Sequence, residues 1–253
     1  MKNTLLKITD LNLFYQTEKA EIQAISNLNL MVNKGEFIAI IGPSGCGKTS
    51  ILSVIAGLIE YEGKVEFFSC EDGSFRENLI GYMLQKDELF SHLTIEQNIF
   101  LPLKIKKIKD KKQKSKGINL LKKYGLYDFK NCYPSELSGG MRQRAALIRT
   151  LTFSPELLLL DEPFSALDYQ TRLNVCDDVY SIIKKEAKTA LLVTHDISEA
   201  ISCADKILVL SQRPARVLYT HEINIDKSLS PLKRREHPNF SAWFEKLWGE
   251  LNL

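Results

Sequence analysis

The chain has 253 residues, enough for one large domain or two modest ones, and its hydrophobic content of 44% can form a sizeable core. The net charge of +3 is small for this length, so charge gives no reason to expect a nucleic-acid partner. The five cysteines form no C-x-x-C pair of the kind that binds zinc or acts as a redox couple, and they fit a reduced, cytoplasmic setting best.

Residues 1–10 lack the charged-then-apolar pattern of a signal peptide, and no run approaches the roughly 20 apolar residues of a membrane-spanning helix. Within residues 5–32, apolar and polar residues alternate on both sides of the polar turn 16–21, which predicts two antiparallel strands. Short apolar runs followed by turn residues predict buried parallel strands at 37–41, 157–160, 190–194 and 207–210.

The stretch 87–149 has helical periodicity and few strand signals, so we interpret it as a helical subdomain inserted into an α/β core with a mixed sheet. Within it, the run 104–116 carries eight lysines, a density that also occurs where proteins bind nucleic acid or anionic lipid. Ile105 and Ile108 recur at a three-residue step and no aromatic residue lies in the run, which favours a solvated helix with a narrow buried edge.

The tail from residue 230 turns polar and basic and ends in an apolar helical stripe. We expect one domain over residues 1–229 and a helical extension over residues 230–253. The default interpretation is that the stripe packs on the chain's own domain, and a partner subunit is the alternative. The stripe consists of Phe240, Trp243, Phe244, Leu247, Trp248 and Leu251.

Residues 42–49 match the pattern G-x-x-x-x-G-K-[ST] and lie between the predicted strand 37–41 and a helical pattern over 48–59. Glycines in such a loop let backbone N–H groups turn inward toward phosphate oxygens, beside the positive N-terminus of the helix. Lys48 would reach the β- and γ-phosphates of ATP, and the Thr49 hydroxyl would bind Mg²⁺. Cys46 is interpreted as a small filler residue rather than a reactive thiol. The residues assigned to ATP here are Gly42, Pro43, Ser44, Gly45, Cys46, Gly47, Lys48, Thr49 and Ser50.

The predicted strand at 157–160 ends in two carboxylates, Asp161 and Glu162. Asp161 is placed to hold Mg²⁺ through its water shell, and Glu162 is suited to polarise an attacking water, which is commonly worth about 10² to 10⁴ in rate. A strand that ends in Asp-Glu is by itself also typical of an ordinary solvated turn. Together with the phosphate loop, the pair indicates hydrolysis of ATP.

Residues 137–144 place a serine and two glycines just before a helical pattern over 145–150. Ser138 is either a plain helix N-cap or part of an exposed helix N-terminus that binds a second anion. Because the chain has two phosphate-binding elements but one phosphate loop, the second element is expected to serve the nucleotide of another molecule.

Together these motifs resemble the ATP-binding cassette (ABC) ATPases, the motor subunits of ABC transporters, over nearly the whole chain. The resemblance includes the signature at 137–143, Leu-Ser-Gly-Gly-Met-Arg-Gln, which other phosphate-loop NTPases lack. It also includes Gln85, the segment 165–168 and His195. It implies the ABC ATPase fold, with a mixed sheet in the phosphate-loop core, an N-terminal antiparallel β subdomain and an inserted helical subdomain.

The resemblance also implies roles for single residues. Gln85 would contact Mg²⁺ and the attacking water, and His195 would contact the γ-phosphate; with Glu162 they form the expected catalytic set. Tyr15 lies where the family has an aromatic residue that stacks on adenine, a contact worth roughly 1–3 kcal/mol. The adjacent Phe14 is an alternative for this role.

A second copy of the chain is the partner that the resemblance implies for the nucleotide site. Ser138, Gly139 and Gly140 would bind the γ-phosphate of the ATP held by the opposite subunit, and Asp168 would lie at the seam between the two copies.

Within the family, the segment 157–168 followed by 210–217, Leu-Ser-Gln-Arg-Pro-Ala-Arg-Val, looks like the ATPases of nitrate, sulfonate, taurine and thiamine-precursor importers. Arg213 and Pro214 are equally compatible with a tight hairpin turn that has no other role. The chain departs from that subgroup at residues 88–92, where the subgroup tends to have a Leu-Pro-Trp type of segment. This surface is expected to meet the membrane partner, so the departure leaves the partner's identity open.

These implications lead to the expectation of an energy-coupling subunit of an importer at the cytoplasmic face of the inner membrane. Its cofactors would be ATP and Mg²⁺, and its partners integral membrane permease subunits and, indirectly, an extracytoplasmic solute-binding protein. An exporter or lipoprotein-release ATPase is the first alternative. A soluble ABC protein that acts on DNA or ribosomes is the second, although such relatives usually carry tandem cassettes or long coiled-coil insertions.

Overall fold

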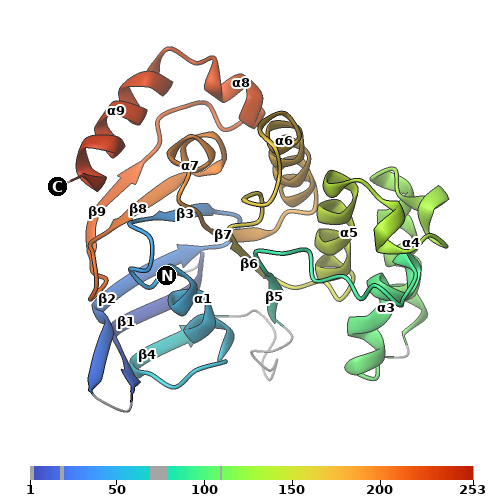
Figure 1. Cartoon of the computed structure of the whole chain (residues 1–253), viewed down its shortest axis with the longest axis horizontal. Coiled ribbons are helices and arrows are strands. Elements are labelled where there is room, and N and C mark those ends of the chain that lie inside the picture. The colour runs from blue at the N-terminus through green and yellow to red at the C-terminus, as the bar shows by residue number, and fades with distance from the viewer. Residues whose placement is uncertain (1–2, 18–19, 69–78, 109, 253) are drawn as a thin grey trace.

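The computed structural model describes residues 3–17, 20–68, 79–108 and 110–252. Near the N-terminus, three strands form an antiparallel sheet in the order β2-β1-β4 (Figure 1). The first two strands pair antiparallel as far as Gln16 and Glu21, as the alternation of apolar residues predicts. The three strands are β1 (Thr4–Gln16), β2 (Glu21–Asn33) and β4 (Glu62–Phe67).

A second sheet of six strands lies at the centre of the molecule, in the order β5-β6-β7-β3-β8-β9. Its first five strands are parallel and β9 is antiparallel to β8, which makes the sheet mixed. Every residue of β3, β6 and β7 is buried, as expected for strands covered on both faces. The strands are β3 (Phe37–Ile41), β5 (Ile80–Met83), β6 (Leu157–Asp161), β7 (Thr189–Val193), β8 (Lys206–Leu210) and β9 (Val217–Glu222).

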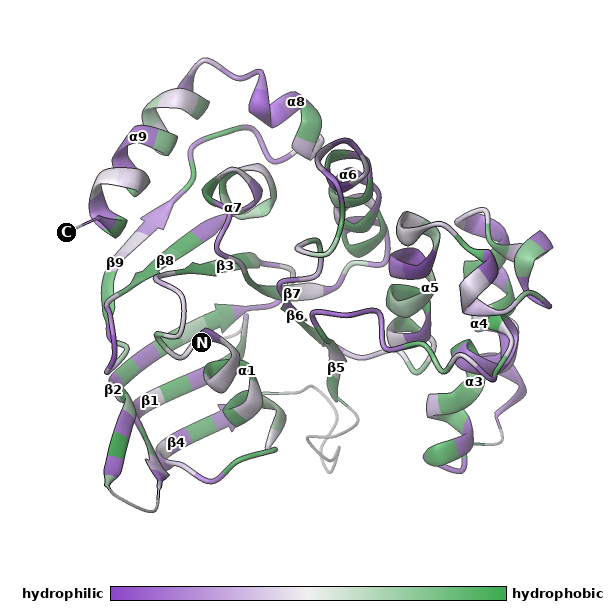
Figure 2. Ribbon diagram, viewed as in Figure 1, coloured by the Kyte–Doolittle hydropathy of each residue, from purple (hydrophilic) through white to green (hydrophobic). Residues whose placement is uncertain are grey.

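The central strands are largely hydrophobic (Figure 2). Their successive side chains contribute to two apolar clusters, one on each face of the sheet. In β3, Phe37 and Ile41 join the cluster that also includes residues of α6 (Tyr169–Lys185) and α7 (Ile197–Cys203). Ile38 and Ile40 join the cluster shared with the N-terminal sheet and α1 (Lys48–Ala56). The carboxyl ends of β3, β6 and β7 therefore meet at one fixed edge between two packed layers.

Helix α1 is three residues shorter than the predicted pattern over 48–59. Gly57 adopts the left-handed conformation, with φ of 76°, and its N–H bonds to the carbonyl oxygen of Val54. This cap ends the helix at Ala56.

Three helices that lie between β5 and β6 in the chain pack together at one side of the central sheet (Figure 1). The fold class is thus the predicted one, an α/β core with an N-terminal antiparallel sheet and inserted helices. The inserted helices are α3 (Ile95–Ile105), α4 (Lys111–Lys123) and α5 (Gly139–Leu151), with short 3₁₀ turns at Tyr127–Phe129 and Pro134–Glu136.

The prediction of one helix with a buried edge over the lysine run is wrong. Helix α3 ends within the run at Ile105, whose side chain is 70% exposed. A new helix begins at Lys111, because the side chain of Asp110 accepts a hydrogen bond from the backbone of Lys112. Ile108 is partly buried, and Lys109 lies outside the described residues.

The C-terminal segment folds into α8 (Pro231–Arg235) and α9 (Asn239–Leu251). Helix α9 packs on α7 and β8, and its apolar stripe joins the core cluster through the buried Leu247. Trp248 is the exception, since 59% of it is exposed and its ring stacks on Phe244. The default interpretation, packing on the chain's own domain, is therefore correct. Among the described residues, no helix is both long and apolar enough to cross a membrane.

Candidate functional site

The phosphate loop connects β3 to α1 and has a backbone that only glycine adopts readily. Gly45 and Gly47 have φ of 72° and 121°, in the left-handed region. A Cβ on Gly42 would lie 3.0 Å from the Cβ of Leu210, so the loop begins against the end of β8. The buried Lys48 donates hydrogen bonds from Nζ to the carbonyl oxygens of Gly42 at 2.8 Å and Pro43 at 2.9 Å, which places its charge over the loop.

The carboxylate at the end of β6 lies directly beside the first turn of α1. Thr49 Oγ1 donates to Asp161 Oδ1 at 3.0 Å, and the Tyr82 hydroxyl donates to Asp161 Oδ2 at 3.4 Å. Burial raises the pKa of Asp161, and the neighbouring charge of Glu162 raises it further. Burial and the Asp161 charge raise the pKa of Tyr82 to about 12. Hydroxyl and carboxylate oxygens are the donors that Mg²⁺ prefers, so this pair fits a magnesium ion shared with phosphate oxygens.

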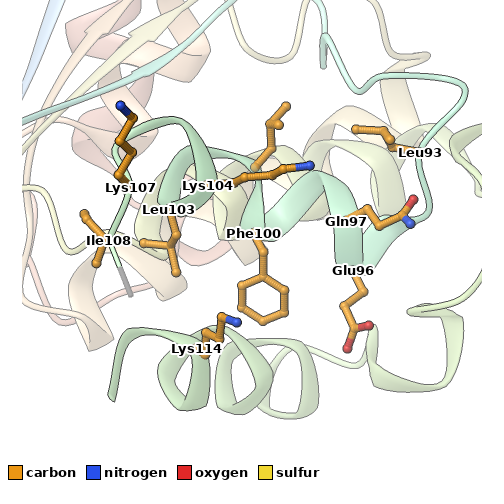
Figure 3. Close-up of a pocket in the computed structure, with 10 residues that line it drawn as sticks. Leu93, Glu96, Gln97, Phe100, Leu103, Lys104, Lys107, Ile108 and Lys114 are labelled. Atoms are coloured by element: carbon orange, nitrogen blue, oxygen red, sulfur yellow. The ribbon is translucent and has the colours of Figure 1, made fainter. Parts of the chain in front are cut away.

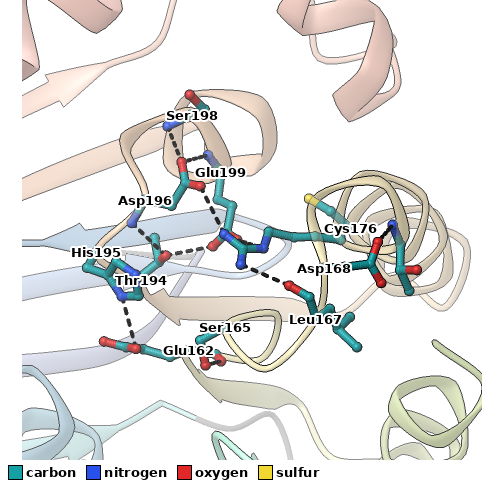
Figure 4. A network of polar contacts seen from close by, with 12 residues as sticks. Glu162, Ser165, Leu167, Asp168, Cys176, Thr194, His195, Asp196, Ser198 and Glu199 are labelled. Carbon is teal, nitrogen blue, oxygen red and sulfur yellow. Dashed lines mark hydrogen bonds and ion pairs between the residues drawn. The ribbon is translucent and has the colours of Figure 1, made fainter. Parts of the chain in front are cut away.

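A second carboxylate, Glu162, lies beside His195, which belongs to a different segment (Figure 4). Its Oε2 atom is 3.0 Å from Nδ1 of His195 and accepts a hydrogen bond from Nε2 of Gln85 at 3.4 Å. Gln85 also donates to Ser165 Oγ at 3.3 Å. The His195 side chain is 52% exposed, so this group is open to a ligand or to water. The three residues of the expected catalytic set thus come together at the sheet edge.

The backbone of Glu162 has φ of 44°, in the left-handed region that disfavours residues with a side chain. Its N–H donates to the carbonyl oxygen of Val193 at 2.8 Å, which ties the end of β6 to the end of β7. Strain of this kind costs about 1–3 kcal/mol and persists where neighbours enforce it, often at active sites.

A buried polar network supports the segment that carries His195 (Figure 4). Thr194 Oγ1 donates to the buried Glu199 at 2.6 Å and accepts from the backbone N–H of Asp196 at 3.0 Å. Arg172 of α6 lies 3.7 Å from Asp196 and 4.0 Å from Glu199. Burial raises the pKa of Glu199 to about 7, a shift that the hydrogen bond from Thr194 opposes. Sequence reasoning missed this network, because Asp196 followed by Glu199 reads as an ordinary helix start.

The remaining predicted residues form a separate group at the starts of α5 and α6. Ser138 caps α5, since its Oγ accepts a hydrogen bond from the backbone of Met141 at 3.3 Å, and Asp168 caps α6 in the same way. A Cβ on Gly140 would lie 2.8 Å from Cγ2 of Val175 of α6, so the two helix starts pack closely. Hydrogen bonding with Thr171, first with its side chain and then with its backbone, lowers the pKa of Asp168. Within the described residues, no hydrogen bond joins Ser138, Gly139, Gly140 or Asp168 to the phosphate loop.

Tyr15, at the end of β1, is 39% exposed, and its hydroxyl lies 2.9 Å from Oγ of Ser50 in α1. The contact sets this ring beside the phosphate loop. Phe14 is similarly exposed, but the hydrogen bond to α1 distinguishes Tyr15 as the residue of the pair that the structure joins to the loop. Sequence reasoning missed two further contacts at the site, those of Tyr82 with Asp161 and of Arg213 with the loop carbonyl of Gly45.

A cavity of about 740 Å³ lies in the inserted helices, away from these groups (Figure 3). Phe100 points from α3 toward α4, where Gly117 leaves room for its ring, and Lys114 of α4 also lines the cavity. None of the predicted site residues lines this cavity.

Comparisons with known proteins give one family. The model of the family described as ABC transporter matches residues 25–165. Over 243 residues the chain is 47% identical to the uncharacterized ABC transporter ATP-binding protein YtlC of Bacillus subtilis (strain 168), covering 94% of this chain and 92% of the relative. Over 242 residues it is 38% identical to the aliphatic sulfonates import ATP-binding protein SsuB of the same strain, covering 92% and 91%.

Among solved structures, a dimeric post-hydrolysis state of the ATP-binding cassette MJ0796 bound to ADP and Pi matches with a TM-score of 0.71 and 30% sequence identity. The match covers 88% of this chain and 100% of that one. The likeness therefore extends over the N-terminal sheet, the central sheet and the inserted helices together.

Proposed function

Because the chain belongs to the ABC transporter ATP-binding family and is therefore an ATPase, we propose that it is the energy-coupling subunit of an importer. The proposed cargo is a small anion or organic solute such as a sulfonate or taurine, nitrate or a thiamine precursor. The 38% sequence identity to the aliphatic sulfonates import ATP-binding protein supports this class of cargo, as does the Arg-Pro segment at 210–217.

In the proposed mechanism, the N–H groups of the loop 42–49 and the ammonium of Lys48 bind the β- and γ-phosphates of ATP. Thr49, Asp161 and Gln85 would hold Mg²⁺, partly through water. The ion supplies positive charge that offsets the charge developing on the phosphate oxygens. Tyr15 would stack on the adenine ring. The contact of the Tyr15 hydroxyl with Ser50 supports this role, because it sets the ring beside the end of the phosphate loop.

For hydrolysis, Glu162 would accept a proton from the attacking water, and His195 would contact the γ-phosphate. The distance of 3.0 Å between His195 Nδ1 and Glu162 Oε2 supports a shared role. The imidazole would orient the carboxylate and would itself contact the γ-phosphate. Gln85 would report whether a nucleotide is bound, and its hydrogen bond of 3.4 Å to the same carboxylate supports this role.

One observation carries the proposal that two copies act together. The residues of the phosphate loop and strand ends are joined by hydrogen bonds within the chain. Among the residues that the structure describes, no hydrogen bond joins Ser138, Gly139, Gly140 or Asp168 to them. A head-to-tail pair would place this second group against the phosphate loop of the opposite copy. The dimeric cassette structure supports this arrangement. ATP would favour the closed pair because both copies contact it, and hydrolysis would reopen it.

The proposed partners are integral membrane permease subunits at the cytoplasmic face of the membrane, served by an extracytoplasmic solute-binding protein. Residues 88–92 belong to the surface that would meet the permease, and Phe90 within it is 48% exposed. An exporter or lipoprotein-release system remains the alternative that uses the same ATPase chemistry.

Uptake by cells that lack this chain would test the proposal. We expect loss of uptake of one labelled solute among sulfonates, nitrate and pyrimidine precursors, with recovery by the native chain and none by Glu162→Gln. Affinity purification from detergent-solubilised membranes would give the partner. Recovery with ribosomes or DNA, without an integral membrane protein, would contradict the importer.

A further inference from the structure

The turn between β8 and β9, residues 211–216, lies against the phosphate loop rather than free in solvent. Ala215 donates from its N–H to the carbonyl oxygen of Ala24 at 2.8 Å, and its own carbonyl accepts from the N–H of Ser26 at 3.0 Å. Within the turn, the Ser211 hydroxyl donates to the carbonyl oxygen of Pro214 and accepts from the N–H of Arg216. The turn is therefore fixed to β2 at one point and closed upon itself at another.

Arg213 projects from this turn to the tip of the phosphate loop. Its NH2 group donates a hydrogen bond to the carbonyl oxygen of Gly45 at 2.8 Å. Gly45 has φ of 72°, and the position of a Cβ on it would meet no atom within 4 Å, so little packing restrains this part of the loop. From the sequence, the Arg-Pro pair is interpreted as a turn and as a marker of the importer subgroup. In the structure its arginine contacts a residue 168 positions earlier in the chain.

The geometry of the peptide bond gives this contact a consequence for phosphate binding. In a trans peptide the C=O and the following N–H point in opposite directions. The Gly45 carbonyl accepts from Arg213, and on the opposite side of the same peptide the N–H of Cys46 donates to the carbonyl oxygen of Pro43 at 3.3 Å. Glycine has no Cβ to limit its rotation, so without Arg213 only the longer bond to Pro43 would hold this peptide plane, which could then turn and direct its oxygen at an incoming anion.

We propose that Arg213 is a positioning residue for the phosphate loop: together with the hydrogen bond from Cys46 to Pro43, it fixes the peptide between Gly45 and Cys46 and keeps the Gly45 carbonyl oxygen turned away from the nucleotide phosphates. The inference rests on the proposed phosphate-binding role of residues 42–49. A guanidinium suits this task because it keeps its charge at any physiological pH and donates in a fixed plane.

Nucleotide binding by the full-length chain tests the role directly. Arg213→Ala should weaken the binding of fluorescent analogues of both MgADP and MgATP by about threefold to tenfold, as expected for loss of one charged hydrogen bond. Both nucleotides should be affected alike, because both carry the β-phosphate. Arg213→Lys, which keeps one charged donor, should recover part of the affinity.

The matched control is Arg216→Ala. It removes the same charge from the same turn, but this exposed side chain makes no hydrogen bond with the loop residues 42–49, all of which are described. Amide exchange measured by mass spectrometry should be faster over the peptide 42–50 in Arg213→Ala and unchanged in Arg216→Ala. The thermal midpoints of both variants should stay close to that of the native chain.

Two results would overturn the proposal. One is that Arg213→Ala leaves both nucleotide affinity and amide exchange unchanged. The other is that Arg213→Ala and Arg216→Ala weaken nucleotide binding equally, which would mean that only the lost charge matters. Lys48→Ala separates this failure from failure of the proposed site. If Lys48→Ala binds nucleotide as tightly as the native chain, the loop itself is not the phosphate site.

Discussion

Two groups of polar residues differ in how they are held. At the carboxyl ends of β3, β6 and β7, side chains from distant segments are hydrogen-bonded to one another, as Thr49 is to Asp161 and His195 to Glu162. At the starts of α5 and α6, the side chains of Ser138 and Asp168 accept hydrogen bonds from Met141 and Thr171 of their own helices. The first group is joined within one chain, whereas the second is the one that we propose acts on the nucleotide of a second copy.

The largest effect on ATP turnover should come from a change in the first group, at the carboxyl ends of β3, β6 and β7. Glu162→Gln keeps the shape of the side chain but removes its capacity to accept a proton, so we expect ATP turnover to fall by about 10² to 10⁴. ATP binding should persist, and gel filtration with ATP should show an accumulated dimer. Turnover at the native rate would exclude Glu162 as the general base.

The second group, at the starts of α5 and α6, is tested by mixing two inactive variants. Ser138→Arg should bind ATP but hydrolyse it at least roughly tenfold more slowly. The bulky arginine side chain would prevent residue 138 of one copy from contacting the γ-phosphate of the ATP held by the other copy. Lys48→Ala should fail to bind ATP. Mixed together, they should regain turnover, because one of the two sites in a mixed pair combines a native phosphate loop with a native Ser138. No recovery on mixing, although the two variants form pairs, would mean that both groups act within one chain.

A pH series probes the network that supports His195. The pKa of Glu199 is about 7 in the folded chain, above the 4.5 expected when unfolded, so its contribution to stability is complete below pH 4.5 and is lost as the pH rises to 7. Glu199→Gln does not titrate and can still accept from Thr194. Its stability relative to the native chain should therefore rise over this interval by up to about 3 kcal/mol, measured by urea unfolding. A constant difference across the pH range would show that Glu199 is not held protonated.

The smallest expected effects concern the glycines of two helices. Gly140→Ala would bring a Cβ within 2.8 Å of Val175 and should destabilise the chain by about 1–3 kcal/mol. Gly249→Ala in α9 meets no atom within 4 Å and should stabilise it by up to about 1 kcal/mol through helix propensity. Thermal unfolding of both variants checks the pair. Equal effects would mean that α5 and α6 are not closely packed at this point.

The fold class could be predicted because the apolar runs that form β3 and β6 are buried at every position, and buried strands have this pattern. The phosphate loop could be located because its residues are contiguous. Glu199 and Arg213 could not be assigned in this way, since each acts on a residue from another element and looks locally like a helix start or a turn. The lysine run misled for a related reason. Its periodicity is real, but the cap at Asp110 divides it into two helices.

The left-handed backbone of Glu162 has a consequence for how the chain balances folding against turnover. Any side chain at this position is disfavoured by the local backbone, and glycine would relieve that strain. A variant selected only for resistance to heat would thus be driven toward replacing the proposed general base, and the chain that folds best would be one that no longer works.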